Sequence, residues 1–292
     1  MKPIIFKGSG VALVTPMKED ESVNFSELEK LIEFQIKNKT DAIIVCGTTG
    51  ESATLSDEEK GEVIRFTVEK VNKRVPVIAG TGGNCTRRSI YLSKLAEKLK
   101  CSGVLVVTPY YNKTSQEGLY YHYKTIAESV KIPVILYNVP SRTGIDIALK
   151  TCLKLSKIDN IVAIKEASGD ISKVAKIISL CKDDLYVYSG NDDQILPILS
   201  LGGIGVISVL ANIFPKEMHN INSLYFENSV TECRDLFFKY LDVMNVLFCD
   251  VNPVPVKEAL NILGFSCGKC RMPLFNLSDE NLKKLKNALK TV

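Results

Sequence analysis

Short apolar runs alternate with amphipathic stretches along the first two thirds of the chain. The runs are mostly β-branched and apolar at every position, which is typical of parallel strands that are covered on both faces. They occur at Val11–Val14, Ala42–Val45, Val77–Ala79, Val104–Val107, Val134–Tyr137, Ile161–Ile164, Leu185–Tyr188 and Ile204–Ile207. The pattern therefore predicts eight parallel strands.

The stretches between these runs have the period of helices. Two of them begin with residue pairs that have the spacing of a capping box, Asn24 with Glu27 and Ser56 with Glu59. After about residue 212 the alternation stops and only helical patterns remain, at Glu217–Tyr225, Val230–Phe248, Val256–Leu263 and Leu282–Leu289. Helices therefore alternate with the strands first and then continue alone.

Eight strand and helix units predict an α/β fold, a closed (β/α)8 TIM barrel with right-handed crossovers. An open doubly wound sheet is the alternative. Its GxGxxG fingerprint is missing, because Cys85 stands at the third glycine position after Gly80 and Gly82. We predict a catalytic barrel over residues 1–225 and a C-terminal helical appendage over residues 226–292.

Composition narrows the class of protein. The 292 residues are 46% hydrophobic and 24% charged, and the net charge is +4 without a basic cluster, so we expect no nucleic-acid partner. No window approaches the roughly 18 apolar residues of a membrane span, and no signal peptide is recognisable. The nine cysteines are then expected to be reduced thiols in the cytoplasm. The motif Cys267-Gly-Lys-Cys270 has no second ligand pair for zinc.

Chemistry in such a barrel lies where the strands end and the following loops begin. At the ends of most predicted strands lie side chains that can react or bind a ligand, and one glycine. They are Thr48 and Thr49 after the second, Tyr111 after the fourth, Tyr137 and Arg142 at and after the fifth, Lys165 at the sixth, Gly190 after the seventh and Ile207 in the eighth.

Lys165 is the strongest candidate. It continues the apolar run of the sixth strand, so it is expected to be buried, and burial lowers the pKa of a lysine toward that of an amine nucleophile. The alternative is a lysine that emerges into water or pairs with Glu166. Glu166 is expected on the opposite face of the strand. A lysine that forms a Schiff base is therefore the hypothesis.

The neighbouring candidates fit that hypothesis, although each has a structural alternative. Tyr137 is positioned to exchange protons with an adduct on the lysine, or else it caps the core. Thr48 and Thr49, between two glycines, suit a small carboxylate or form a plain turn. Arg142 is a second anion contact or an exposed loop arginine.

Two other kinds of chemistry, metal-dependent catalysis and phosphate binding, are disfavoured by the residues of this chain. The two histidines, His122 and His219, fall in helical segments, so a metal-dependent aldolase or hydrolase is disfavoured. Barrel phosphate sites usually follow strands seven and eight, where Asp192 and Asp193 would repel a phosphate.

Four motifs together resemble the dihydrodipicolinate synthase family, within the pyruvate-dependent class I aldolase and N-acetylneuraminate lyase superfamily. They occur in the family's order and spacing, as Gly47-Thr48-Thr49-Gly50-Glu51-Ser52, Thr108-Pro109-Tyr110-Tyr111-Asn112, Tyr137-Asn138-Val139-Pro140-Ser141-Arg142-Thr143-Gly144 and Ile164-Lys165-Glu166-Ala167-Ser168. The resemblance extends from the first strand through the C-terminal helices.

The resemblance implies a lyase of lysine (diaminopimelate) biosynthesis that forms an imine between Lys165 and pyruvate and needs no other cofactor. The enamine would then attack L-aspartate 4-semialdehyde, which leads to 4-hydroxy-tetrahydrodipicolinate. Tyr137 resembles the proton donor and acceptor, linked through Thr48 to Tyr111. In the family that second tyrosine crosses from a neighbouring subunit.

The resemblance also implies the binding residues and the assembly. Thr49 and the backbone of Ile207 resemble the contacts to pyruvate, Arg142 the residue that holds the carboxylate of the aldehyde, and Gly190 a position that leaves room near the imine. Family members are commonly homotetramers, built as dimers of dimers. Arg88 stands where lysine-inhibited members have a carboxylate, so we expect L-lysine to inhibit weakly or not at all.

Two alternatives remain open. N-acetylneuraminate lyases usually have Ser-Thr in place of Thr48-Thr49 and lack an arginine at position 142, which disfavours that activity here. A non-catalytic sensor of pyruvate or another keto acid would keep the pocket and lose turnover. No residue favours the sensor, because Lys165, Tyr137 and Tyr111 are all present.

Overall fold

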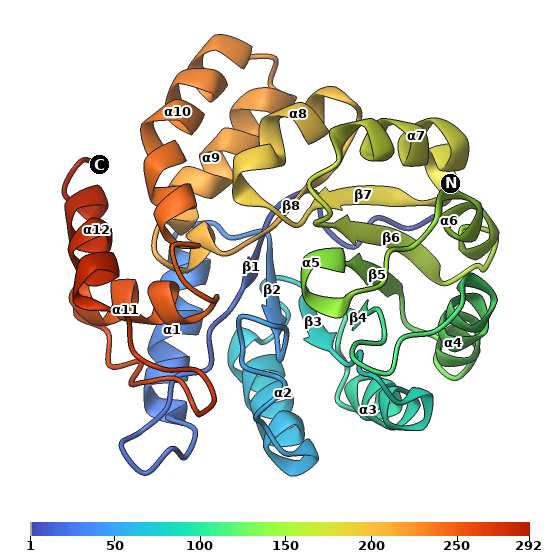
Figure 1. Ribbon diagram of the computed structural model, residues 1–292, viewed down its shortest axis with the longest axis horizontal. Coiled ribbons are helices and arrows are strands. Elements are labelled where there is room, and N and C mark those ends of the chain that lie inside the picture. Colours follow the sequence, from blue (N-terminus) through green and yellow to red (C-terminus); the bar gives the residue numbers. More distant parts are fainter. Residues whose placement is uncertain (1) are drawn as a thin grey trace. The chain divides into compact units, whose positions relative to one another are not determined.

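The computed structural model describes residues 2–292, and its eight strands form a closed barrel in chain order (Figure 1). The strands are β1 (Gly8–Ala12), β2 (Ala42–Val45), β3 (Val77–Gly80), β4 (Gly103–Val107), β5 (Val134–Asn138), β6 (Ile161–Glu166), β7 (Tyr186–Ser189) and β8 (Gly205–Ser208). This confirms the predicted (β/α)8 barrel. The doubly wound alternative is wrong, because an open sheet has edge strands and a closed barrel has none.

Helices follow the strands as the periodicity predicts. They are α1 (Phe25–Lys37), α2 (Asp57–Val71), α3 (Thr86–Lys98), α4 (Gln116–Glu128), α5 (Pro140–Thr143), α6 (Leu149–Leu155), α7 (Ile171–Cys181), α8 (Ile195–Ser200), α9 (Pro215–Phe226), α10 (Val230–Val246), α11 (Val254–Ile262) and α12 (Asp279–Leu289), with 3-10 turns η1 (Lys182–Asp184), η2 (Asp192–Gln194) and η3 (Leu210–Asn212). Within residues 2–292, no helix is long and apolar enough to cross a membrane.

The two predicted helix starts differ in how they are capped. At α2 the capping box is complete, because Ser56 accepts from the backbone N–H of Glu59 and the Glu59 carboxylate accepts from the N–H of Ser56. At α1 only Asn24 caps. The Glu27 carboxylate instead accepts from the backbone N–H of Ser266 at 2.9 Å. A contact to the C-terminal region thus replaces half of the local motif.

The first strand lies earlier in the chain than the apolar run predicts. The run at Val11–Val14 extends past the end of β1, where the backbone N–H of Val14 donates to the Asn212 side chain at 3.0 Å. The same side chain donates to the carbonyl of Ala12 at 2.9 Å. Asn212 therefore ends the strand, and the Gly-Ser-Gly that begins β1 carries no apolar signal.

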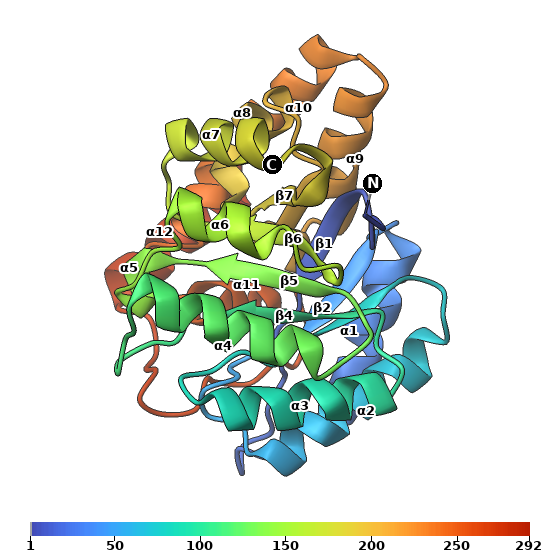
Figure 2. The same ribbon diagram turned by 90° about the vertical axis from the view of Figure 1, so that its right-hand side faces the viewer.

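The chain is organised as two units. Unit 1 comprises residues 2–7 and 76–207, and unit 2 comprises residues 8–75 and 208–292. In unit 1, helices α3, α4, α6 and α7 follow one another along the outer side of the strands (Figure 2). The predicted domain boundary after residue 225 falls at the end of α9 and stays a prediction.

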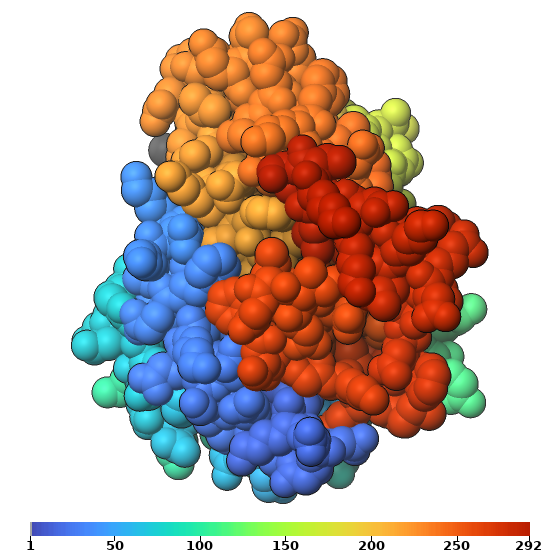
Figure 3. Space-filling view, turned by 90° about the vertical axis from the view of Figure 1, so that its left-hand side faces the viewer, coloured from blue at the N-terminus to red at the C-terminus, as the bar shows by residue number. Residues whose placement is uncertain are grey.

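In unit 2 the C-terminal helices pack against the N-terminal part of the chain. Helix α9 contacts β1 and α10, and α12 contacts α10 and α11. Figure 3 shows the C-terminal segments, in orange and red, side by side with the N-terminal segment in blue. Arg271 joins the two segments through an ion pair with Glu59 of α2. The helices after the barrel are therefore an integral part of this unit.

Both histidines lie in helices, as expected, His122 in α4 and His219 in α9. His122 is buried against α3, where its Nδ1 lies 2.9 Å from the hydroxyl of Thr86. Burial lowers its pKa from 6.5 to about 4, because the charged imidazolium is poorly solvated there. The imidazole is therefore neutral at pH 7.

Replacing His122 tests this burial. Between pH 6.5 and 4 the unfolded chain binds a proton that the folded chain does not, so acidification should lower the free energy of unfolding by up to about 3 kcal/mol. This contribution is fully present above pH 6.5. We expect His122→Asn to flatten that part of the slope, as measured by urea unfolding across the range. Identical slopes for the two proteins would contradict the assignment.

Candidate active site

Strands β5 and β6 place Lys165 beside Tyr137. The two residues are direct partners in the parallel register, and both lie within one residue of the carboxyl end of their strand. The Lys165 Nζ lies 4.4 Å from the centroid of the Tyr137 ring. Lys165 is 5% exposed and Tyr137 7%, so the amine and the phenol share a largely desolvated place. An amine held there can add to a carbonyl beside a proton donor.

Glu166 faces away from this pair. Its carboxylate accepts from the Asn138 side chain at 2.9 and 3.0 Å and from the backbone N–H of Ser168 at 2.8 Å. The alternation of side chains along a strand explains this arrangement. The sequence-based expectation that Glu166 would not pair with Lys165 agrees with these contacts.

A second tyrosine, Tyr188, is the register partner of Lys165 on β7. Its hydroxyl already donates to the carbonyl of Phe6 at 2.6 Å, and its ring stacks on that of Phe6. Burial raises the pKa of Tyr188 above its usual value of 10. Tyr188 thus has a structural role, which leaves Tyr137 as the phenol next to Lys165 that is suited to proton transfer.

The other predicted residues of unit 1 lie at or after the ends of β4, β5, β7 and β8. Arg142 lies exposed on the single-turn helix α5, directly after β5. This turn is tied to the end of β4, because the Thr108 hydroxyl donates to that of Thr143 at 2.9 Å. Tyr111 is 91% exposed and has a φ of 70°, so its side chain projects from the loop after β4.

Gly190 and Ile207 complete the set in unit 1. Ile207 is buried in β8. A Cβ on Gly190 would lie 2.6 Å from the Cβ of Ala167 and 3.0 Å from the carbonyl of Glu166. The structural demand for glycine therefore comes from its close approach to the end of β6. Its predicted role in leaving room for an imine stays a prediction.

Thr48 and Thr49 lie in unit 2, in the loop after β2. Thr49 is 3% exposed, and its hydroxyl accepts from the side-chain amide of Asn252 at 3.0 Å. Asn252 lies just before α11, about two hundred residues further along the chain. Asn252 is not among the residues predicted from the sequence, because it lies outside the predicted strand ends.

A buried ion pair holds the end of this loop. The Lys257 ammonium donates to the Glu51 carboxylate at 2.8 Å, and the two side chains are 2% and 0% exposed. Lys257 also donates to the carbonyl of Lys269, and Glu51 accepts from the backbone N–H of Arg271. The C-terminal segment therefore fixes the position of the loop that carries Thr48 and Thr49.

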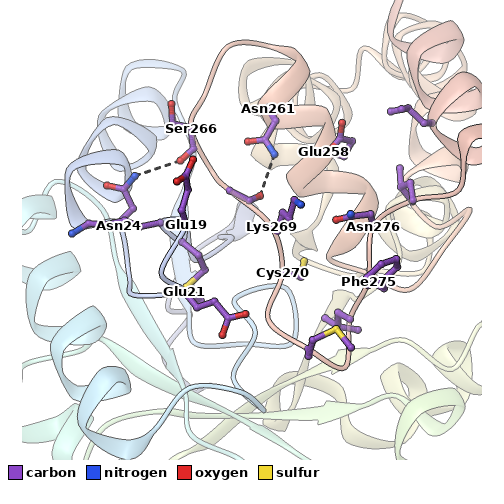
Figure 4. Close-up of a pocket in the computed structure, with 17 residues that line it drawn as sticks. Glu19, Glu21, Asn24, Glu258, Asn261, Ser266, Lys269, Cys270, Phe275 and Asn276 are labelled. Atoms are coloured by element: carbon purple, nitrogen blue, oxygen red, sulfur yellow. Dashed lines mark hydrogen bonds between the residues drawn. The ribbon is translucent and has the colours of Figure 1, made fainter.

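Unit 2 also has a hollow of about 1000 Å³ next to this segment, formed by the loop after β1, by α11 and by residues 266–277 (Figure 4). None of the predicted site residues lines it. Cys270 does, and burial raises the pKa of Cys267 and Cys270 to about 12. Both are protonated thiols near neutral pH, which does not suit a thiolate nucleophile. Within residues 2–292, no group of three or more His, Cys, Asp or Glu side chains is arranged to hold a metal ion.

Lys257→Met should be strongly destabilising, because it leaves the Glu51 carboxylate buried without its counter-ion. We expect a loss of about 3–5 kcal/mol in the free energy of unfolding, measured with urea. Lys70→Met is the matched control, since Lys70 pairs with Glu29 at the surface and should contribute less than about 1 kcal/mol. Similar losses in the two variants would contradict this account of the loop.

Known proteins are similar to this chain over nearly its full length. The model of the "Dihydrodipicolinate synthetase family" matches residues 5–292. The 4-hydroxy-tetrahydrodipicolinate synthase of Clostridium perfringens (strain SM101 / Type A) is 59% identical over 286 residues, which cover 98% of each chain.

Two solved structures are similar throughout. The dihydrodipicolinate synthase of Aquifex aeolicus has a TM-score of 0.95 and 45% identity, covering 98% of this chain and 97% of its own. The chloride-inhibited dihydrodipicolinate synthase of Acinetobacter baumannii, solved in complex with pyruvate, has a TM-score of 0.96 and 45% identity over 99% of each chain. The resemblance seen in the sequence is thereby confirmed, and the chain belongs to the dihydrodipicolinate synthetase family.

Proposed function

We propose that this chain is a 4-hydroxy-tetrahydrodipicolinate synthase, which condenses pyruvate with L-aspartate 4-semialdehyde in the committed step of lysine (diaminopimelate) biosynthesis. The full-length similarity to curated synthases supports this reaction. The observation that carries it in the structure is the buried Lys165 amine, 4.4 Å from the centre of the Tyr137 ring. An amine nucleophile beside a phenol that can transfer protons is an arrangement suited to imine chemistry.

The reaction follows from that pair. The Lys165 amine adds to the C2 carbonyl of pyruvate, and loss of water leaves an imine. A proton then leaves the methyl carbon to give an enamine, whose carbon attacks the aldehyde of the second substrate. Tyr137 supplies and removes the protons of these steps. Closure of the ring by the amino group of the second substrate releases Lys165, so no further cofactor is part of this proposal.

The two substrate carboxylates are assigned to different parts of the site. Thr49 and the backbone of Ile207 are proposed to hold pyruvate, and the tie from Asn252 to the Thr49 hydroxyl supports a fixed binding loop. Gly190 is proposed to leave room beside the imine. Arg142, exposed on α5, is proposed to bind the carboxylate of the aldehyde through its planar guanidinium.

Self-association is part of the proposal. Tyr111 is 91% exposed in the described chain, which supports its predicted role in reaching a second copy and completing a proton relay there with Thr48 and Tyr137. We therefore propose a homotetramer, built from two such dimers, that works in the cytoplasm. Weak or absent inhibition by L-lysine, expected from Arg88, stays a prediction.

Substrate choice tests the reaction directly. Purified protein supplied with pyruvate and L-aspartate 4-semialdehyde should form the cyclic product, followed in an assay coupled to reduction of that product. Cleavage of N-acetylneuraminate by the same preparation is the control and should be absent. Rapid cleavage of the sugar acid without turnover of the semialdehyde would refute the proposal. Turnover of neither substrate by folded protein would favour the sensor.

Arg142→Ala tests the second carboxylate contact. Loss of a bidentate, charge-assisted contact should raise the KM for L-aspartate 4-semialdehyde roughly tenfold to a hundredfold. The KM for pyruvate should change little, because pyruvate is held elsewhere. Arg65→Ala, which removes an exposed arginine from α2, is the control and should leave both KM values unchanged. An unchanged KM for the semialdehyde in Arg142→Ala would rule out this role.

A further inference from the structure

A buried polar cluster lies directly behind Lys165 and Tyr137. Asn138 and Glu166 are the next residues on β5 and β6, and they are also partners in the register. They are 0% and 1% exposed. Because side chains alternate along a strand, Asn138 and Glu166 lie on the opposite face of the strands from Lys165 and Tyr137. A displacement of Asn138 or Glu166 therefore reaches its neighbour, Tyr137 or Lys165, through a single peptide unit.

Hydrogen bonds join the two strands in this cluster. The Asn138 side-chain amide donates to both oxygens of Glu166, at 2.9 and 3.0 Å, and to Asp146 Oδ1 at 2.8 Å. Its carbonyl oxygen accepts from the backbone N–H of Ile147 at 3.0 Å. Asn138 thus uses both ends of its amide, which fixes its orientation.

Lys173 provides the counter-charge. This residue lies in the first turn of α7, its side chain is 9% exposed, and its ammonium pairs with Asp146 and lies 3.6 Å from Glu166 Oε2. Two carboxylates therefore face one ammonium. The Asp146 side chain is 49% exposed, whereas Glu166 and Lys173 are buried. A buried pair of charges is seldom more stable than well-packed apolar side chains of the same volume, so the pair of Glu166 and Lys173 points to a geometric role.

The backbone ladder between β5 and β6 is regular from Ile135 to Asn138, and the backbone N–H of Ala167 donates to the carbonyl of Asn138 at 2.9 Å. Along β5 and β6 the register shifts between Val134 and Ile135, where Val134 pairs with Ile161 but Ile135 pairs with Ala163. A shift of this kind locally disrupts a ladder and bends the strand. The side-chain bond from Asn138 to Glu166 lies beyond the shift, next to the reactive pair, and adds a second connection between the strand ends to that of the backbone.

We propose that Asn138, Asp146, Glu166 and Lys173 form a strand-end clamp that positions the Lys165 amine against the Tyr137 phenol. The clamp rests on the proposed function, since its role is to align these two groups for proton transfer at the pyruvate adduct. Its members touch neither substrate. They act through the backbone of β5 and β6 and are positioning residues.

Asn138→Ala removes the donor that joins the strands. The readout is exchange of the pyruvate methyl protons in D₂O, followed by NMR without the aldehyde, because this exchange needs both the imine and the proton transfer. A displacement of about 1 Å at the reacting groups slows chemistry on the order of a hundredfold, so we expect exchange to slow roughly tenfold to a hundredfold. Thermal unfolding and circular dichroism establish that the variant is folded.

Asn160→Ala is the matched control. Asn160 directly precedes β6, and its side-chain amide donates to the carbonyls of Ala127 and Val130 at 2.8 and 3.0 Å. The variant thus loses comparable bonds at the opposite end of the same strand, and its exchange rate should stay close to that of the wild type. If it slows exchange as much as Asn138→Ala does, the cluster is only structural and the proposal fails.

A double-mutant cycle separates positioning from general damage. In a Tyr137→Phe background the phenol hydroxyl that the clamp aligns with Lys165 is absent. Adding Asn138→Ala should therefore slow exchange far less than it does in the wild type. Full additivity would overturn the clamp. If Asn138→Ala does not fold, Glu166→Gln takes its place in the cycle, because it keeps the shape of the side chain and removes its charge.

The outcomes also separate the clamp from the proposed function. Wild-type protein that exchanges no methyl protons would refute the imine chemistry itself. Wild-type protein that exchanges them, together with folded Asn138→Ala and Glu166→Gln variants that match its rate, would refute the clamp and leave the proposed function intact.

Discussion

The pairing of β5 with β6 is the constraint on which the chemistry of this chain depends. It places a lysine and a tyrosine opposite each other at the carboxyl ends of two buried strands. A lysine amine held in such a position beside a phenol can act as a nucleophile toward a carbonyl. The strands thus serve both as part of the core and as the support of the reacting groups, so their register matters more than their stability.

Polar side chains at the strand ends give each reactive element a second support. Behind Lys165 and Tyr137 this is the cluster around Glu166, and for the loop that carries Thr49 it is Asn252 with the ion pair of Glu51 and Lys257. Both supports are buried, and both join segments that are distant in the sequence. Functional groups that are held by such an outer shell keep their geometry better than groups on free loops.

The barrel could be predicted from the sequence because parallel strands in this fold are apolar on both faces and each is followed by an amphipathic helix. The start of β1 was placed too late, since Gly8-Ser9-Gly10 gives no apolar signal. Lys165 could be found because a single lysine continues an apolar run, and Tyr137 because it ends the run before it. These signals are local and do not require knowledge of the packing.

The supporting residues could not be predicted in the same way. Glu51 and Lys257 are 206 residues apart, and nothing in either segment indicates the other. Asn138 and Glu166 were visible as residues beside the candidates, but their partnership depends on a register that shifts between Val134 and Ile135. The proximity of side chains follows from tertiary structure, whereas the apolar period of a strand or helix is already present in the chain.

The central claim is that Lys165 forms an imine with pyruvate, and trapping that imine tests it most directly. The protein is incubated with pyruvate and borohydride, its intact mass is measured, and the modified peptide is mapped. We predict one reduced pyruvyl adduct per chain, on Lys165, and none in a folded Lys165→Arg variant. Folded wild-type protein that forms no adduct, or that carries it on another lysine, would contradict the account.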